Sequence, residues 1–311
     1  MQNRRKFIGQ SMLATAGLLA SRSALAGLKG EEGIKKLTIL HTNDVHSRLE
    51  PFPMDGGRNQ GLGGVAARAE LIQKIRNEAE NVLLLDAGDI FQGTPFFNIY
   101  KGEPEMKAMA AMGYDAATMG NHDFDAGLEN FATQLKHGNF PLIICNYDFT
   151  GTPMEFRYQP YKVFKKGGLK IGVIGVGIEM AGLVPDSLFG KTKYLDPIQK
   201  ANETASMLKR EDGCDMIICL SHLGYKYKDN KVSDEVFARE TENIDLIIGG
   251  HTHTFMDEPA LYKNKAGSDV LVHQVGWAGI MLGRLDFEFA GYKRKNLAKS
   301  HTVAVGKKTM E

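Results

Sequence analysis

Five short apolar runs in this 311-residue sequence are each followed within three residues by aspartate, asparagine or histidine. The runs occupy residues 37–40, 82–85, 116–119, 216–220 and 244–248. Apolar runs of this length are typical of buried strands. Because ligands bind outside the carboxyl ends of the strands in open α/β sheets, we expect the five polar segments to meet in one crevice.

The remaining pattern predicts an α/β fold. Further apolar runs at 142–145, 171–176 and 270–275 predict strands. Apolar residues at helical spacing predict helices over 64–79, 125–137, 197–211 and 231–241. Alternating strands and helices indicate a layered α/β architecture. Residues 282–289 and 300–305 flank a basic turn and predict a β-hairpin, and we expect a single domain over 27–311.

Composition excludes some classes of function. Apolar residues make up 43% of the chain, which is ample for a packed core. The formal net charge of +1 gives no support for a nucleic-acid polymer as partner. Residues 27–290 carry 28 basic and 36 acidic residues, a balance that suits metal cations better than polyanions.

The three cysteines and one glycine-rich run have structural interpretations. Cys145, Cys214 and Cys219 are too few for a disulfide framework or a four-cysteine metal site, so we expect buried thiols. Residues 172–177 read Gly-x-x-Gly-x-Gly, which differs from the dinucleotide-binding fingerprint and lies within a predicted strand. Close backbone packing is the expected reason for those glycines.

The side chains after the five runs have the composition of a metal site. They combine carboxylate, amide and imidazole groups and contain no thiolate. Such a mixed oxygen and nitrogen set suits Mn²⁺, Zn²⁺, Fe²⁺ or Co²⁺. Each segment alone is a weak signal, whereas all five in this order are a strong one.

Together the segments resemble the calcineurin-like metallophosphoesterases, and within them the catalytic, amino-terminal domain of the 5′-nucleotidases. The matching stretches are 40–46 (LHTNDVH), 88–89 (GD), 120–125 (GNHDFD), 221–224 (SHLG) and 250–253 (GHTH). The first stretch and the Phe124-Asp125 extension favour the 5′-nucleotidase branch. The resemblance covers roughly residues 36–306 and implies a four-layer αββα sandwich with two divalent metal ions.

The resemblance also implies which residues would hold the metals. The ligands of the first ion would be Asp44, His46, Asp89 and His253. The ligands of the second ion would be Asp89, Asn121, His222 and His251. His122 resembles the catalytic histidine of the family, oriented by Asp125, and Asn121 and His122 would also contact the substrate.

The expected reaction is hydrolysis of a phosphate ester. Two divalent cations bring four positive charges against two negative charges from Asp44 and Asp89, so the centre attracts the ester and stabilises the transition state. A hydroxide bridging the metals would attack phosphorus in line with the leaving oxygen. His122 would stabilise or protonate the leaving group. Phosphomonoesters such as nucleoside 5′-monophosphates are the leading substrates.

Two other functions fit the same residues. A phosphodiesterase acting on cyclic nucleotides, or a thiosulfohydrolase, would use the same metal site. A metal-binding, non-catalytic subunit of a split 5′-nucleotidase is the third reading, although a pure binding protein needs no pair such as His122 and Asp125. Most 5′-nucleotidases carry a carboxy-terminal domain with an aromatic clamp for the base, and nothing in this sequence matches it. Either a separate chain supplies that domain or the substrate range is broader.

Residues 1–26 have the three-part layout of a secretory signal. A basic start, Arg4-Arg5-Lys6, precedes a mostly apolar or small stretch at 8–20 and a small-x-small pattern at 24–26. The stretch is shorter than the ~20 residues of a membrane-spanning helix. The paired arginines resemble a bacterial twin-arginine signal, so we expect export to the periplasm. An uncleaved anchor is the alternative.

The twin-arginine route predicts that changing both Arg4 and Arg5 to Lys abolishes export, although the basic charge is kept. Fractionation of bacteria expressing the full chain measures this as loss of the periplasmic form. Lys6→Arg is the matched control and should be exported normally. Unchanged export of the double variant would exclude the twin-arginine route.

Overall fold

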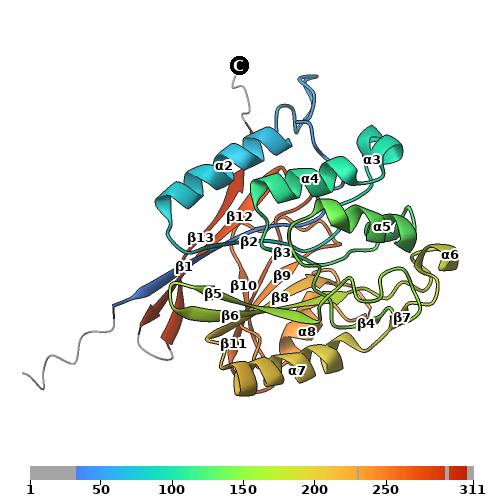
Figure 1. Ribbon diagram of the computed structural model, residues 1–311. Coiled ribbons are helices and arrows are strands. Elements are labelled where there is room, and N and C mark those ends of the chain that lie inside the picture. The colour runs from blue at the N-terminus through green and yellow to red at the C-terminus, as the bar shows by residue number, and fades with distance from the viewer. Residues whose placement is uncertain (1–32, 230, 291–293, 307–311) are drawn as a thin grey trace, which may run out of the picture.

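Two β-sheets stacked face to face form the middle of the fold (Figure 1). The computed structural model describes residues 33–229, 231–290 and 294–306, so the predicted signal at 1–26 lies outside the described residues. Apolar side chains from both sheets fill the space between them. They include Leu83 and Leu85 from one sheet and Ile218 and Leu220 from the other, all fully buried.

The first sheet joins early and late parts of the chain in the order β13-β12-β1-β2-β3. Its strands are β1 (Lys35–Thr42), β2 (Val82–Asp86), β3 (Ala116–Ala117), β12 (Met281–Ala290) and β13 (Arg294–Ala304). β1, β2 and β3 are parallel. β12 and β13 form an antiparallel hairpin that pairs with β1, which confirms the predicted hairpin.

The second sheet has the order β10-β11-β9-β8-β6-β5. Its strands are β5 (Tyr161–Lys166), β6 (Leu169–Gly177), β8 (Met216–His222), β9 (Leu246–Gly249), β10 (Ala260–Lys263) and β11 (Asp269–His273). The four inner strands are parallel, and β5 and β10 are antiparallel edges. A separate pair consists of β4 (Tyr147–Asp148) and β7 (Lys193–Tyr194).

Helices cover the outer face of each sheet (Figure 1). Those beside the first sheet are α2 (Val65–Glu78), α3 (Pro95–Tyr100), α4 (Glu103–Met112) and α5 (Leu128–Gln134). The others are α6 (Asp186–Phe189), α7 (Pro197–Met207) and α8 (Asp234–Glu240). Ile72 of α2 packs into one core with Leu84, and Phe237 of α8 packs into another with Ile217. The predicted αββα order of layers is therefore confirmed.

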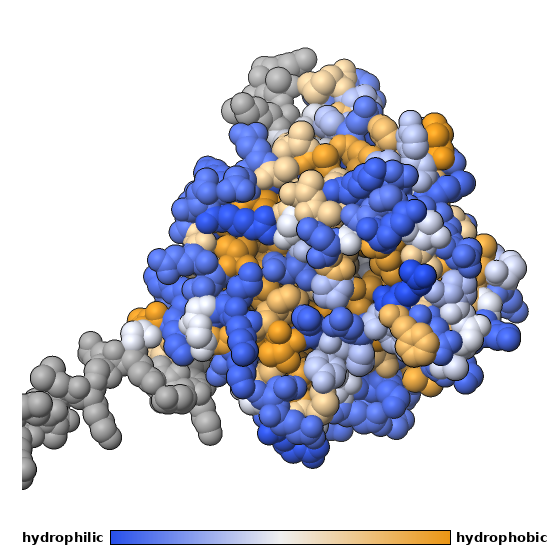
Figure 2. All heavy atoms as spheres, viewed as in Figure 1, coloured by the Kyte–Doolittle hydropathy of each residue, from blue (hydrophilic) through white to orange (hydrophobic). Residues whose placement is uncertain are grey.

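Single-turn elements complete the described chain. They are the 3-10 turns η1 (His122–Phe124) and η2 (Leu135–His137) and the π-helical turn η3 (Leu208–Asp212). No helix in the described ranges has the length and apolar character that crossing a bilayer requires. Hydrophilic residues dominate the face shown in Figure 2, and an apolar group at its upper right coincides with α3, where Ile99 and Tyr100 are more than half exposed.

Residues 142–145 do not form the strand that their apolar character predicts. Their hydrogen bonds go to two different sheets: Ile143 N–H donates to Ala117 O in β3, and Cys145 N–H donates to Gly175 O in β6, both at 2.8 Å. A segment that alternates between two sheets cannot continue a ladder with either, so only isolated bridges form.

The helix predicted over 125–137 begins late and is divided. Gly127 adopts a φ of 80°, outside the helical region, so α5 starts at Leu128 and the last turn tightens into η2. The helices α3 and α4 and the edge strands β5 and β10 are additional to the sequence prediction. The three cysteines are buried free thiols, as expected.

The glycine-rich run lies within β6 and packs closely against its neighbours, as the sequence predicts. A Cβ atom built on Gly175 would overlap the carbonyl oxygen of Ile143, which is backbone and cannot move aside easily. Glycine is therefore required where the segment 142–145 crosses β6.

Gly175→Ala is expected to lower the free energy of unfolding by ~1–3 kcal/mol, because the added methyl group overpacks this contact. Urea unfolding followed by circular dichroism measures the change. Gly33→Ala is the control, since a Cβ at Gly33 meets nothing within 4 Å. Equal stability of the two variants would contradict the close-packing interpretation.

Candidate metal centre

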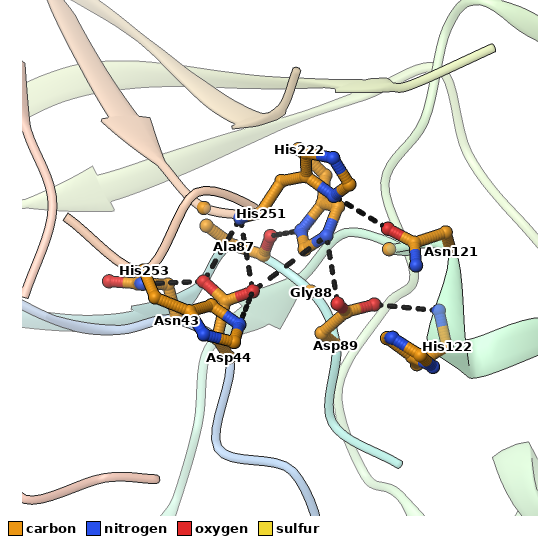
Figure 3. Close-up of polar contacts among 12 residues, drawn as sticks. Asn43, Asp44, Ala87, Gly88, Asp89, Asn121, His122, His222, His251 and His253 are labelled. Atoms are coloured by element: carbon orange, nitrogen blue, oxygen red, sulfur yellow. Dashed lines mark hydrogen bonds and ion pairs between the residues drawn. The ribbon is translucent and has the colours of Figure 1, made fainter. Parts of the chain in front are cut away.

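The segments that follow β1, β2, β3, β8 and β9 meet at one edge of the sandwich (Figure 3). Parallel strands in each sheet end at the same edge, so the loops of both sheets converge there. The side chains brought together are Asp44, His46, Asp89, Asn121, His122, His222, His251 and His253. Every predicted ligand position therefore lies in this cluster.

One group of possible ligand atoms consists of Asp44, His46 and His253. The two imidazole Nε2 atoms lie 3.0 Å apart. His253 Nε2 is 3.4 Å from Asp44 Oδ1, and His46 Nε2 is 3.9 Å from the same oxygen. Three such atoms within reach of one point have the arrangement that a divalent cation requires.

A second group consists of Asp89, His222 and His251. His222 Nε2 lies 3.1 Å from Asp89 Oδ2. The side-chain oxygen of Asn121 lies 2.7 Å from His251 Nδ1, which adds an amide oxygen to this group. The predicted second set of residues is thus assembled.

Asp89 lies between the two groups. Its Oδ2 atom is 3.1 Å from His222 Nε2 and 3.8 Å from His46 Nε2. Its other oxygen, Oδ1, accepts a hydrogen bond of 2.8 Å from the His122 backbone N–H. A carboxylate in this position can provide a ligand oxygen to a cation in each of the two groups.

The chemistry of His222 fits a cation at this place. Its Nδ1 atom lies 2.7 Å from Ala87 O, while the fully buried Nε2 atom faces the carboxylates of Asp89 and Asp44 at 3.1 and 3.9 Å. Burial works to lower the pKa of His222, but the carboxylates of Asp89 and Asp44 raise it to about 10. The pocket therefore favours positive charge at Nε2, which a proton or a metal ion supplies.

The backbone of the centre is held in an unusual conformation. Asp44, His46, Asp89, His251 and His253 all have φ values between 50° and 72°. Left-handed backbone is uncommon for residues other than glycine and costs of order 1 kcal/mol or more. Several such residues in one cluster indicate that function, rather than stability, determines these loops.

Asp123 holds the loop that carries Asp89. One of its carboxylate oxygens accepts hydrogen bonds from the N–H groups of Ile90 and Phe91, and the other from those of Asp89 and Gly120, at 2.9–3.1 Å. Asp123 is not among the predicted site residues. Its fourth place in the GNHDFD stretch is the only sign of it in the sequence.

His122 and Asp125 form the predicted pair. His122 Nδ1 lies 2.8 Å from Asp125 Oδ2, and this bond comes first among the causes that raise the pKa of His122. The bond leaves Nε2 as the free ring nitrogen, and the side chain is partly exposed. The pair comes from η1 and the residue after it, immediately beside Asn121.

Comparison with known proteins identifies relatives of this chain. The family model described as calcineurin-like phosphoesterase matches residues 37–255. The snake venom 5′-nucleotidase of Gloydius brevicauda is 35% identical over 284 residues, covering 85% of this chain and 47% of that protein. The 5′-nucleotidase of Vibrio cholerae is 36% identical over 279 residues, covering 82% of this chain and 49% of that protein.

Among solved structures, the 5′-nucleotidase precursor from Thermus thermophilus superposes with a TM-score of 0.78 and 32% identity. The superposition covers 87% of this chain and 55% of that one. The chain spans about half the length of the curated relatives that it matches.

Asp123→Ala is expected to cost ~3 kcal/mol of stability, because it leaves buried backbone N–H groups without an acceptor. It should also weaken metal binding by roughly 10–100-fold, since the Asp89 loop loses its support. Urea unfolding and equilibrium dialysis with Mn²⁺ measure the two effects. Asp269→Ala, which removes an exposed carboxylate paired with Lys263, is the control and should change neither. Full Mn²⁺ affinity in a folded Asp123→Ala chain would contradict this role.

Proposed function

The chain belongs to the calcineurin-like phosphoesterase family, and from that premise we propose that it hydrolyses phosphate monoesters with two divalent cations. The observation that carries this proposal is the position of Asp89 between two groups of ligand atoms. A site for one metal needs only one such group. A shared carboxylate is what a two-metal site needs.

We assign the ligands as follows. The residues that would hold the first cation are Asp44, His46, Asp89 and His253. Those that would hold the second are Asp89, Asn121, His222 and His251. The donor atoms are oxygen and nitrogen, which favours Mn²⁺, Zn²⁺, Fe²⁺ or Co²⁺. When bound, the two cations polarise the phosphoryl oxygens and supply an activated water for in-line attack.

His122 is the proposed catalytic residue. Asp125 fixes the ring through Nδ1, so Nε2 is free to donate a proton or hydrogen bond to the leaving oxygen. The His122 backbone is tied to Asp89, which keeps the ring at a constant position relative to the metal site. Asn121 and His122 would both contact the phosphate.

Nucleoside 5′-monophosphates are the proposed substrates. The support is the similarity to 5′-nucleotidases over more than four-fifths of this chain. A separate chain that supplies a base-binding domain is also proposed, and the comparison of substrates below tests it. Export to the periplasm through the signal at 1–26 is also proposed, and the Arg4 and Arg5 variants test it.

His122→Ala is expected to keep both metal ions and lose roughly 10²–10⁴-fold in turnover, because only proton donation is removed. Asp89→Ala is the matched variant and should lose metal together with activity. Phosphate release and metal analysis of the same protein preparations measure both. Full activity of His122→Ala would contradict its assignment.

The substrate proposal predicts phosphate release from 5′-AMP by the Mn²⁺-loaded chain. The comparison substrate is p-nitrophenyl phosphate, which shares the phosphate but not the nucleoside. A preference for 5′-AMP means that this chain holds the nucleoside itself, and equal slow hydrolysis of both means that a partner chain supplies selectivity. Hydrolysis of neither would contradict the proposed reaction.

A further inference from the structure

Trp277, the only tryptophan in the sequence, stacks on the imidazole ring of His253. The ring centroids are 5.9 Å apart and the planes differ by 11°. Phe52 contacts Trp277 edge to face, with centroids 5.8 Å apart. The indole is thus held between a residue of the metal centre and a second aromatic ring.

His253 differs from His46 and His222 in how its ring is held. In those two, Nδ1 faces a backbone oxygen: Phe91 O at 3.3 Å for His46 and Ala87 O at 2.7 Å for His222. Within the described ranges, the polar contacts of the His253 ring all involve Nε2. Metal-binding histidines are normally oriented by a hydrogen bond to the second nitrogen. The ring of His253 instead has the Trp277 indole stacked on it.

The backbone around Trp277 is tied to the loop that carries Asp44. Val275 N–H donates to Asn43 Oδ1 at 2.9 Å, and Asn43 Nδ2 donates to Gly276 O at 2.7 Å. Ala278 N–H donates to Asp44 O at 2.7 Å. These bonds flank Trp277 on both sides.

The same segment is tied to the loop that carries His253. Gly276 N–H donates to Thr254 O at 2.9 Å, and Thr254 N–H donates to Gln274 Oε1 at 3.1 Å. Residues 274–278 therefore bridge two loops that contribute to the first ligand group. His253 has a left-handed φ of 51°, so its loop needs such support to stay in place.

We propose that Trp277 is a positioning residue that orients His253 for metal binding, in the role that the Nδ1 contact to a backbone carbonyl has in His46 and His222. The proposal rests on the proposed function, because it takes His253 as a metal ligand. Indole stacked on a ligand is also close enough to a bound paramagnetic ion for its emission to be quenched. Trp277 is thus an intrinsic reporter of the first metal position.

The first experiment measures tryptophan emission while Mn²⁺ or Co²⁺ is added to the chelator-treated chain. Saturable quenching is expected, because Trp277 is the sole indole. His253→Ala should lose this quenching, and His301→Ala, which changes a histidine of β13 outside the ligand groups, should keep it. Zn²⁺ controls for quenching that does not come from a paramagnetic ion.

The second experiment measures Mn²⁺ binding by equilibrium dialysis in Trp277→Ala and Trp277→Phe. The alanine variant should bind roughly 10–100-fold more weakly, as expected for lost support of a ligand. The phenylalanine variant should recover most of the affinity, because it still presents a ring to His253. Phe156→Ala removes an aromatic side chain that is 93% exposed and should bind normally.

The outcomes separate the two proposals. Failure of the wild-type chain to bind Mn²⁺ would overturn the proposed function. The role of Trp277 alone would be overturned by two results together. The wild-type chain would bind Mn²⁺ normally without quenching of its emission, and the folded Trp277→Ala chain would bind Mn²⁺ with unchanged affinity. Weak binding by both Trp277 variants would also contradict it, since the recovery by a smaller aromatic ring is the specific expectation.

Discussion

Asp44 and Asp89 are almost completely removed from solvent, and each lies against imidazole nitrogens rather than against lysine or arginine. Burial of a carboxylate is costly unless positive charge compensates it. Imidazole supplies positive charge only when it is protonated. Because many possible metal-ligand atoms point into this centre, divalent cations compensate the two carboxylates better than protons do. The need for cations at this point explains the supports around it, from the hydrogen bonds of Asp123 to the stacked ring of Trp277.

The αββα layers are what allow distant parts of the sequence to meet at the cations. Parallel strands in both sheets end at one edge, so His46 after β1 and His253 after β9 approach within 3.0 Å although 207 positions separate them. The shared edge brings these residues close together but does not orient their side chains. Left-handed backbone at five positions of the cluster sets the direction of those five side chains, and hydrogen bonds from neighbouring loops maintain that backbone.

The residues of the site were predictable because their signal is local. An apolar run followed within four positions by Asp44, Asp89 or His222 carries both the strand and the donor in a short stretch of sequence. The resemblance to a known family then divided those residues between two metals. The layers followed from the same alternation of strands and helices.

Other features depend on contacts that no local pattern contains. The apolar character of residues 142–145 predicts a strand, but their hydrogen bonds are divided between Ala117 and Gly175 in different sheets. Trp277 has no motif around it, and its position against His253 arises only when β9 and the segment before β12 come together. Asp123 lies within a recognised motif, yet its role is seen only from the backbone N–H groups that donate hydrogen bonds to its carboxylate.

Electron paramagnetic resonance of the Mn²⁺-loaded chain tests most directly the proposal that two cations share Asp89. Two Mn²⁺ ions per chain with a spin-coupled spectrum are the predicted result, because one carboxylate between both ligand groups keeps the ions close together. A single isolated Mn²⁺ signal at saturation, with one ion per chain, would contradict the account.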